Sequence, residues 1–200
     1  MNGSAPAQPR PKVFGIGLNK TGTSSLHRAL ELLGYRSFHF GGFETNDHIL
    51  RAIDDRKPML SYLDPEPDAI SDVVLVTYFF YLADAQYPGA KFILTLRDVD
   101  EWLDSRRRHV ERNQQMKEAG EYEGWFLNVD IDLWVQEYRR HEAIVRTYFA
   151  HRPDDLLAFR PAEDDWDPLC NCLGHPVPEL PVPWENRDRS DVGSEEMVEQ

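Results

Sequence analysis

The chain has 200 residues and a hydrophobic fraction of 41%, which is enough for one domain that buries a sheet and its covering helices. Its formal net charge of −13 opposes attraction to nucleic acid or to an anionic membrane surface, so neither is expected as a partner. No apolar run approaches the length of a membrane span and the start, MNGSAPAQPRPK, is polar, so we expect a cytoplasmic protein.

Composition divides the chain into one domain and two ends. Residues 1–11 and 186–200 are polar and the second segment is acidic, which predicts a flexible arm and a solvated tail. The domain between them, residues 12–185, alternates short apolar runs with longer amphipathic patterns. Cys170 and Cys172 have no His or Cys set at zinc spacing around them, so no metal site is predicted.

The first elements of the domain read as strand, loop and helix. Residues 13–18 (VFGIGL) form a short apolar run typical of a strand, and a helical pattern follows after a polar turn. Thr23 or Ser24 is expected to cap this helix, and Gly34 to end it. A second strand is predicted at residues 36–40.

The later elements continue this alternation. The strongest strand signal is KFILTL at residues 91–96, a continuous apolar run suited to a parallel sheet that is covered on both faces. Strands are also predicted at residues 59–63 and 156–159, and helices at residues 48–56, 76–85, 100–117 and 131–149. This order predicts an α/β fold with three layers, αβα, around a mostly parallel sheet.

A loop rich in glycine and hydroxyl groups connects the first strand to its helix. Its glycines let backbone N–H groups turn inward, and the helix N-terminus adds partial positive charge, an arrangement that favours phosphate or sulfate. Its side-chain donors are Lys20, Thr21, Thr23, Ser24 and Ser25. Lys20 precedes Gly22 by two positions, whereas the Walker A lysine follows the last glycine, which weighs against an ATPase or kinase. The alternative is a turn that only caps the helix.

A second basic site is predicted where the strand at residues 91–96 ends. Arg97 follows this strand directly, and Ser105 lies eight residues later inside the next helix. Ligands of open α/β sheets bind at the carboxyl ends of strands, where a guanidinium and a hydroxyl can converge on one anion. The alternative is an arginine that binds main-chain carbonyls. Together, two anion sites on neighbouring strand ends fit one ligand with phosphate-type groups at its 5′ and 3′ positions.

Both motifs resemble those of the sulfotransferases that use 3′-phosphoadenosine 5′-phosphosulfate (PAPS). The loop sequence NKTGTSSL is similar to their 5′-phosphosulfate pattern P-K-[ST]-G-T-[TS]-x-L, and the spacing of Arg97 and Ser105 is similar to their 3′-phosphate motif R-[ND]-P-x(5)-S. The similarity covers about residues 13–110, and DDWDPLCNCLGHPVPELPVPWEN resembles the end of a bacterial branch. Asn19 and Val99 replace prolines of the family patterns. The C-terminal Arg-Lys-Gly element of the animal enzymes is absent, with Arg187 or Arg189 as its potential substitutes.

This resemblance implies a fold like that of P-loop nucleotide hydrolases, with PAPS as the donor and 3′,5′-adenosine diphosphate as the product. It implies that Lys20 neutralises the leaving oxygen, that Arg97 and Ser105 bind the 3′-phosphate, and that no metal is required. The residues that it assigns to the 5′ side of the donor are Asn19, Lys20, Thr21, Gly22, Thr23, Ser24 and Ser25.

The resemblance also implies a general base, often His and sometimes an acid, before the 3′-phosphate strand. Asp72 occupies that place, and a carboxylate can accept a proton from a hydroxyl if a dry pocket raises its pKa toward neutrality. The alternative role of Asp72 is an N-cap for the helix at residues 76–85. His39, near a strand end, is the second candidate, with an ordinary polar role as its alternative.

The predicted function is transfer of a sulfuryl group to a hydroxyl or amine of a small-molecule acceptor. Trp125, Phe126 and Trp134 are predicted to cover the acceptor pocket, but the sequence does not identify the acceptor. An ATP-dependent P-loop phosphotransferase and a non-catalytic nucleotide-binding protein are the alternatives. The choice between Asp72 and His39, the contacts of the adenine and the choice between a monomer and a homodimer remain open.

Overall fold

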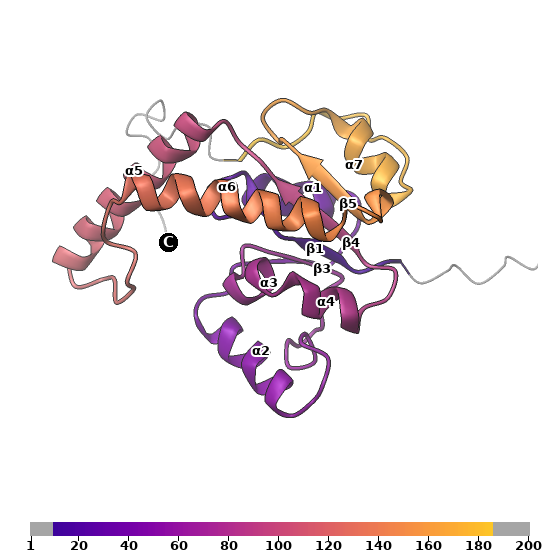
Figure 1. Cartoon of the computed structure of the whole chain (residues 1–200), viewed down its shortest axis with the longest axis horizontal. Coiled ribbons are helices and arrows are strands. Elements are labelled where there is room, and N and C mark those ends of the chain that lie inside the picture. The colour runs from indigo at the N-terminus through magenta and orange to yellow at the C-terminus, as the bar shows by residue number, and fades with distance from the viewer. Residues whose placement is uncertain (1–9, 186–200) are drawn as a thin grey trace, which may run out of the picture.

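The computed structural model describes residues 10–185, so residues 1–9 of the predicted arm and all of the predicted tail, with Arg187 and Arg189, lie outside the described residues. One sheet of five parallel strands in the order β2-β3-β1-β4-β5 forms the centre of the molecule (Figure 1). The strands are β1 (Val13–Gly15), β2 (Ser37–His39), β3 (Ala69–Ser71), β4 (Lys91–Thr95) and β5 (Leu156–Phe159).

Helices connect the strands and cover the sheet. They are α1 (Thr23–Leu32), α2 (Glu44–Asp54), α3 (Val74–Tyr78), α4 (Phe80–Gln86), α5 (Val99–Glu118), α6 (Ile131–Tyr148) and α7 (Trp166–Leu173), with a short 3-10 turn (Pro153–Asp155) before β5. Asp98 caps α5 by accepting hydrogen bonds from the backbone N–H groups of Asp100 and Glu101. Within residues 10–185, no helix has the length and apolar character needed to span a membrane.

The alternation of side chains along β4 explains the three layers. Phe92 and Leu94 point into a core formed with α3, α4, α5 and α6, whereas Ile93 points into a second core formed with α1 and α7. All three side chains are fully buried, as the continuous apolar run requires. Figure 1 shows α1 and α7 on one side of the sheet and α2, α3 and α4 on the other. The predicted three-layer α/β fold is confirmed.

The prediction of a strand at residues 59–63 is wrong. This segment forms turns, and the third strand is β3, after the proline-rich turn. Met59, Leu60 and Leu63 are buried in the core all the same, so their apolar character reflects packing and not strand pairing.

Two helical predictions also differ from the structure. The helix predicted at residues 76–85 is divided into α3 and α4 by Phe79, whose φ of −110° departs from helical geometry. Helix α7 was not predicted; Asp165 caps its start by accepting from the N–H of Asp167, and Gly174 ends it in a left-handed conformation. Proline at the third position of α7 is compatible with a helix because it lies in the first turn, whose N–H groups need no intrahelical acceptor.

The topology fixes where a ligand can bind. Strand β1 lies between β3 and β4 in the sheet. The chain therefore crosses from one side of β1 to the other in the segment that connects β3 to β4. In parallel sheets the carboxyl ends of strands that flank such a change of direction border a crevice. The segments that leave β1, β3 and β4 contain Lys20, Asp72 and Arg97, respectively.

Candidate active site

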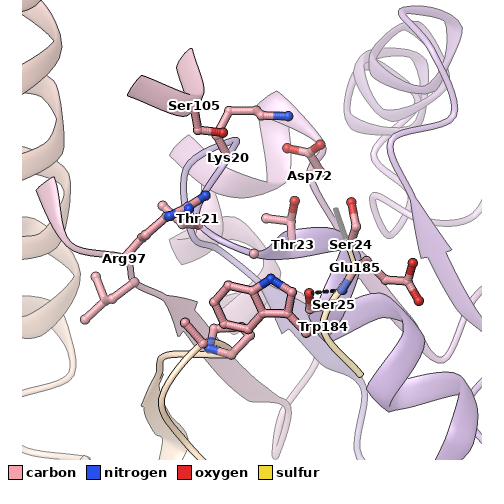
Figure 2. Close-up of a pocket in the computed structure, with 14 residues that line it drawn as sticks. Lys20, Thr21, Thr23, Ser24, Ser25, Asp72, Arg97, Ser105, Trp184 and Glu185 are labelled. Carbon is pink, nitrogen blue, oxygen red and sulfur yellow. Dashed lines mark hydrogen bonds between the residues drawn. The ribbon is translucent and has the colours of Figure 1, made fainter. Parts of the chain in front are cut away.

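One cleft at the carboxyl ends of β1, β3 and β4, the main cleft, brings the two predicted anion sites together (Figure 2). The predicted site residues in its wall are Lys20, Thr21, Gly22, Thr23, Ser24, Ser25, Asp72, Arg97 and Ser105. Its other residues are Leu96, Pro161, Ala162, Trp184 and Glu185, which were not assigned from the sequence. The turn around Lys20 and the exit of β4 therefore face the same space.

The loop after β1 is held against the neighbouring strand β4. A Cβ atom on Gly17 would lie 2.0 Å from Thr95 Oγ1, so only glycine permits this approach. Thr21 Oγ1 donates a hydrogen bond to the Leu18 carbonyl at 2.6 Å and lies 2.6 Å from Thr95 Oγ1. The hydroxyl of Thr21 thus holds the loop in place, and it is already occupied within the protein.

The end of the loop presents backbone N–H groups to the main cleft. Lys20 has a φ of 69° and Gly22 a φ of 100°, so the backbone turns through left-handed conformations at both residues. Gly22 is the N-cap of α1 and provides no side-chain cap, so the predicted capping by Thr23 or Ser24 is wrong. The first N–H groups of α1 have no acceptors within the helix and carry its positive dipole end, which suits an anion.

Lys20 lies in a region of positive charge. Burial lowers the pKa of its ammonium group, and the nearby cations Arg112 and Arg97 lower it further, while Asp72 raises it. An anion in the main cleft would add a negative charge beside Lys20 and so favour the charged form of its ammonium group. Figure 2 shows the side chains of Lys20 and Asp72 directed into the same part of the cleft.

Arg97 is positioned by α6. Its backbone N–H donates to the Tyr138 hydroxyl at 3.1 Å, and the same hydroxyl donates to the Arg97 carbonyl at 2.6 Å. The guanidinium Nε donates to Glu101 at 3.1 Å, and Figure 2 shows the group directed toward the loop at Lys20 and Thr21. Ser105, two turns along α5, lines the same cleft, so a guanidinium and a hydroxyl are available to one anion.

Asp72 follows β3 directly, and its backbone has a positive φ angle. Its φ of 57° is in the left-handed region, which non-glycine residues adopt rarely and asparagine and aspartate more often than others. Burial raises the pKa of its carboxyl to about 6, an effect that the Lys20 charge partly opposes. The N-cap of α3 is Val73, and no side chain caps this helix, so the alternative N-cap role of Asp72 is wrong.

His39, the second candidate base, lies beside the main cleft at the end of β2. Its Nε2 is 3.5 Å from Asp72 Oδ2 and 3.2 Å from Thr23 Oγ1. Burial, followed by the charges of His27 and Lys20, lowers its pKa to about 4. The His39–Asp72 contact is therefore no ion pair, because the imidazole loses its charge below the pH at which the carboxyl gains one.

The C-terminal segment closes one side of the main cleft. The backbone N–H of Glu185 donates to Ser25 Oγ at 2.9 Å, which brings the indole of Trp184 over the loop (Figure 2). Asn19, in contrast, lies outside the main cleft: its carbonyl accepts a hydrogen bond from Trp102 Nε1 at 2.9 Å. The sequence signal that could have identified Trp184 is an aromatic residue between a proline-rich segment and a polar tail. Its position over the loop depends on a contact with a distant segment, which the local sequence does not reveal.

A second pocket adjoins the main cleft and shares Asp72 with it. Its wall consists of Leu18, Asn19, Phe40, Phe43, Asp72, Val74, Thr77, Tyr78, Arg106, His109, Arg112, Asn113, Met116, Tyr122, Trp125, Phe126 and Glu137. Two of the aromatic residues predicted to cover an acceptor, Trp125 and Phe126, line it. Trp134 lies behind them, with its ring stacked on Phe126 at 5.7 Å.

Comparison with known proteins gives two similarities. Residues 12–190 match the model of the family described as "Sulfotransferase domain", which covers all but the two ends of the chain. The chain is also 28% identical over 212 aligned positions to "Ava biosynthesis cluster protein M" of Aspergillus versicolor, covering 86% of this chain and 79% of that protein.

Proposed function

The chain belongs to the sulfotransferase domain family, and on this premise we propose that it transfers the sulfuryl group of PAPS to a hydroxyl or amine of a small-molecule acceptor. The observation that carries the proposal is the main cleft, in which the loop around Lys20 and the pair Arg97 and Ser105 face one another. A nucleotide with phosphate-type groups at its 5′ and 3′ ends is a ligand that needs both.

In this proposal, each part of the main cleft binds one part of the donor. The N-terminus of α1 and Lys20 hold the 5′-phosphosulfate, and Arg97 with Ser105 holds the 3′-phosphate. Trp184 provides a flat aromatic face for the adenine. The sequence left the adenine contacts open, and Trp184 is the residue that we propose for them. These groups fit the donor by charge and by hydrogen-bonding type, since donors predominate where the phosphate-type groups would lie.

The chemistry needs little beyond positioning and charge. When bound, the donor supplies a sulfuryl group whose transfer, like phosphoryl transfer, builds negative charge on the leaving oxygen. Lys20 neutralises that charge, and the N–H groups at the start of α1 hold the adjoining phosphate. Asp72 accepts the proton of the acceptor hydroxyl or amine, for which its raised pKa is well suited near neutral pH.

The position of Asp72 supports its role as the base. Asp72 is a wall residue of both the main cleft and the second pocket, so a molecule in the second pocket can direct its nucleophile toward a donor in the main cleft past this carboxylate. His39 lines neither space, and its contacts include Thr23, Ser24 and Asp72. We assign His39 a positioning role, through its contact with Asp72.

Thermal-shift measurements test the choice of nucleotide. Stabilisation by 3′,5′-adenosine diphosphate in the absence of magnesium supports the proposal, whereas stabilisation by ATP with magnesium alone would favour a phosphotransferase. A protein that neither nucleotide stabilises would be better described as an interaction protein. Incubation with PAPS and candidate metabolites, followed by mass spectrometry for the added sulfuryl mass, then tests transfer itself.

Two variants test the assigned roles. Lys20→Ala should lower turnover by at least about a hundredfold and leave the fold intact, because one charge-stabilising donor commonly contributes that much. Arg97→Ala should weaken 3′,5′-adenosine diphosphate by about tenfold to a hundredfold, the usual worth of hydrogen bonds to a charged group. Arg107→Ala is the matched control, because Arg107 is an exposed residue of α5 that pairs with Asp104 and lies outside the main cleft. Wild-type turnover in Lys20→Ala would contradict the proposal.

A further inference from the structure

The second pocket gathers apolar side chains that a folded protein normally covers. Phe40 and Phe43 are 51% and 55% exposed, and Trp125 is 74% exposed, yet all three line this one pocket. Val74 and Tyr78, also exposed, complete the same wall. Exposed apolar side chains that converge on one pocket are typical of a site for an apolar ligand.

Two oppositely charged residues of this pocket, Arg106 and Glu137, neutralise one another. Arg106 donates to Glu137 at 2.7 Å, and its guanidinium lies over the rings of Phe126 and Trp134 at 4.9 Å and 4.6 Å from their centroids. The other carboxylate oxygen of Glu137 accepts a hydrogen bond from the Tyr78 hydroxyl. Neither Arg106 nor Glu137 therefore offers an unbalanced charge to a ligand.

Arg112 differs from this pair. Its Nη2 lies 2.7 Å from Nδ1 of His109, whose pKa is lowered to about 4 by burial and by nearby cations, so the imidazole is neutral at physiological pH. No carboxylate within residues 10–185 lies within 4.0 Å of Arg112. Arg112 is close enough to the reacting centre to lower the pKa of Lys20. The second pocket thus has an apolar wall with one cation that no carboxylate of the described residues balances.

Resting on the proposed function, we infer that the acceptor is an apolar, ring-bearing alcohol or amine with an anionic substituent, which Arg112 binds while the nucleophile faces Asp72. The aromatic wall takes the ring, and the guanidinium provides a donor pair matched to a carboxylate. A cationic acceptor of the same shape is disfavoured, since its charge would face that of Arg112. Because the chain carries a net charge of −13, an anionic group is attracted only where a local cation such as Arg112 faces it, which gives the pocket selectivity among apolar molecules.

Binding of three matched probes to the full chain tests this inference. They are 3-(4-hydroxyphenyl)propanoate, its uncharged carboxamide and the cation tyramine, each titrated calorimetrically at pH 7.5 with 3′,5′-adenosine diphosphate present. We expect the acid to bind about tenfold more tightly than the amide, and tyramine to bind most weakly. Arg112→Gln should remove the preference for the acid and leave amide binding unchanged, and Arg112→Lys should restore part of the preference. Arg107→Gln, on the same helix but outside the pocket, should behave as wild type.

Equal binding of acid and amide to the wild-type protein, retention of the preference in Arg112→Gln, or the absence of binding of every probe would each overturn the inference. Failure of the proposed function gives a different result. In that case 3′,5′-adenosine diphosphate would not bind, whereas the acid, titrated alone, would keep its dependence on Arg112. Turnover of the acid with PAPS, together with a raised KM for the acid in Arg112→Gln, would support both the proposed function and this inference.

Discussion

Asp72 is expected to determine how the reaction depends on pH. Its pKa of about 6 arises because burial penalises the carboxylate, while the Lys20 ammonium only partly offsets that penalty. A base acts in its deprotonated form, so activity should rise as pH increases through this value. With a pKa of about 6 the ionised fraction is ~10% at pH 5 and ~90% at pH 7, which predicts an increase of about tenfold in kcat/KM.

Initial rates at low acceptor concentration between pH 4.5 and pH 8 measure this dependence, since kcat/KM reports the ionisation of the free enzyme. Asp72→Asn should lower kcat/KM by about 10²–10⁴-fold, the usual contribution of a general base, and should remove the inflection near pH 6. Asp68→Asn provides the control, because Asp68 lies at the opposite end of β3 and pairs with Arg36.

The same profile distinguishes the two candidate bases. A base with the pKa of His39, about 4, would already be deprotonated at pH 5, so the profile would be flat between pH 5 and pH 7. A flat profile in the wild-type protein, or a wild-type rate in Asp72→Asn, would refute the assignment of Asp72. Loss of activity in a His39→Ala variant that keeps the inflection near pH 6 would agree with the positioning role proposed for His39.

The stability of Asp72→Asn and two further variants test the physical basis of the site. The folded-state pKa of Asp72 is raised, so its ionisation lowers the free energy of unfolding as pH rises from about 4 to about 6. Asp72→Asn removes this cost, so it should raise the free energy of unfolding at pH 7 by up to about 3 kcal/mol, with a higher Tm. Near pH 4 the same variant should leave Tm unchanged. Gly22→Ala should lower Tm by several degrees and weaken nucleotide binding, because a left-handed alanine costs about 1–2 kcal/mol and its Cβ would lie 2.8 Å from Pro161 Cγ. Trp102→Phe should destabilise the chain by about 1–3 kcal/mol in urea titrations, because the Asn19 carbonyl loses its indole donor; an unchanged midpoint would contradict this.

The sequence was sufficient to predict that the loop around Lys20 and the exit of β4 share one cleft, because each segment is encoded locally. The loop after β1 and the exit of β4 are each defined by a few adjacent residues, and a buried parallel strand such as residues 91–96 is recognisable from its continuous apolar run. The strand at residues 59–63 was wrongly predicted because buried turns and buried strands have the same apolar composition. Pairing with β1 decides which segment becomes the third strand, and that contact spans more than fifty residues.

The roles of the side chains in the site could not be predicted in the same way, because they depend on contacts between distant segments. Thr21 appears in the sequence as a donor for a ligand, but its hydroxyl is bound to Leu18 and lies against Thr95. Trp184 reaches the main cleft only because Glu185 donates a hydrogen bond to Ser25, 160 positions earlier in the chain. Local patterns predict which backbone segments meet at a strand edge, whereas tertiary packing decides which side chains remain available there.

The distribution of charge connects the two proposals. A chain with a net charge of −13 repels anions at long range, so a bisphosphorylated donor and an anionic acceptor both need strong local attraction. In our proposal Lys20 provides it for the donor; burial lowers the pKa of its ammonium group most, and the neighbouring cations Arg112 and Arg97 lower it further. Arg112 exerts this effect on Lys20 from the second pocket. An anion bound in either space would relieve the repulsion that Lys20 experiences, and would therefore favour the charged form of the group that we propose neutralises the leaving oxygen. In the two proposals taken together, the charge of Arg112 in the second pocket and the ionisation of Lys20 are parts of one electrostatic arrangement, and an acceptor without the anionic group would lose rate as well as affinity.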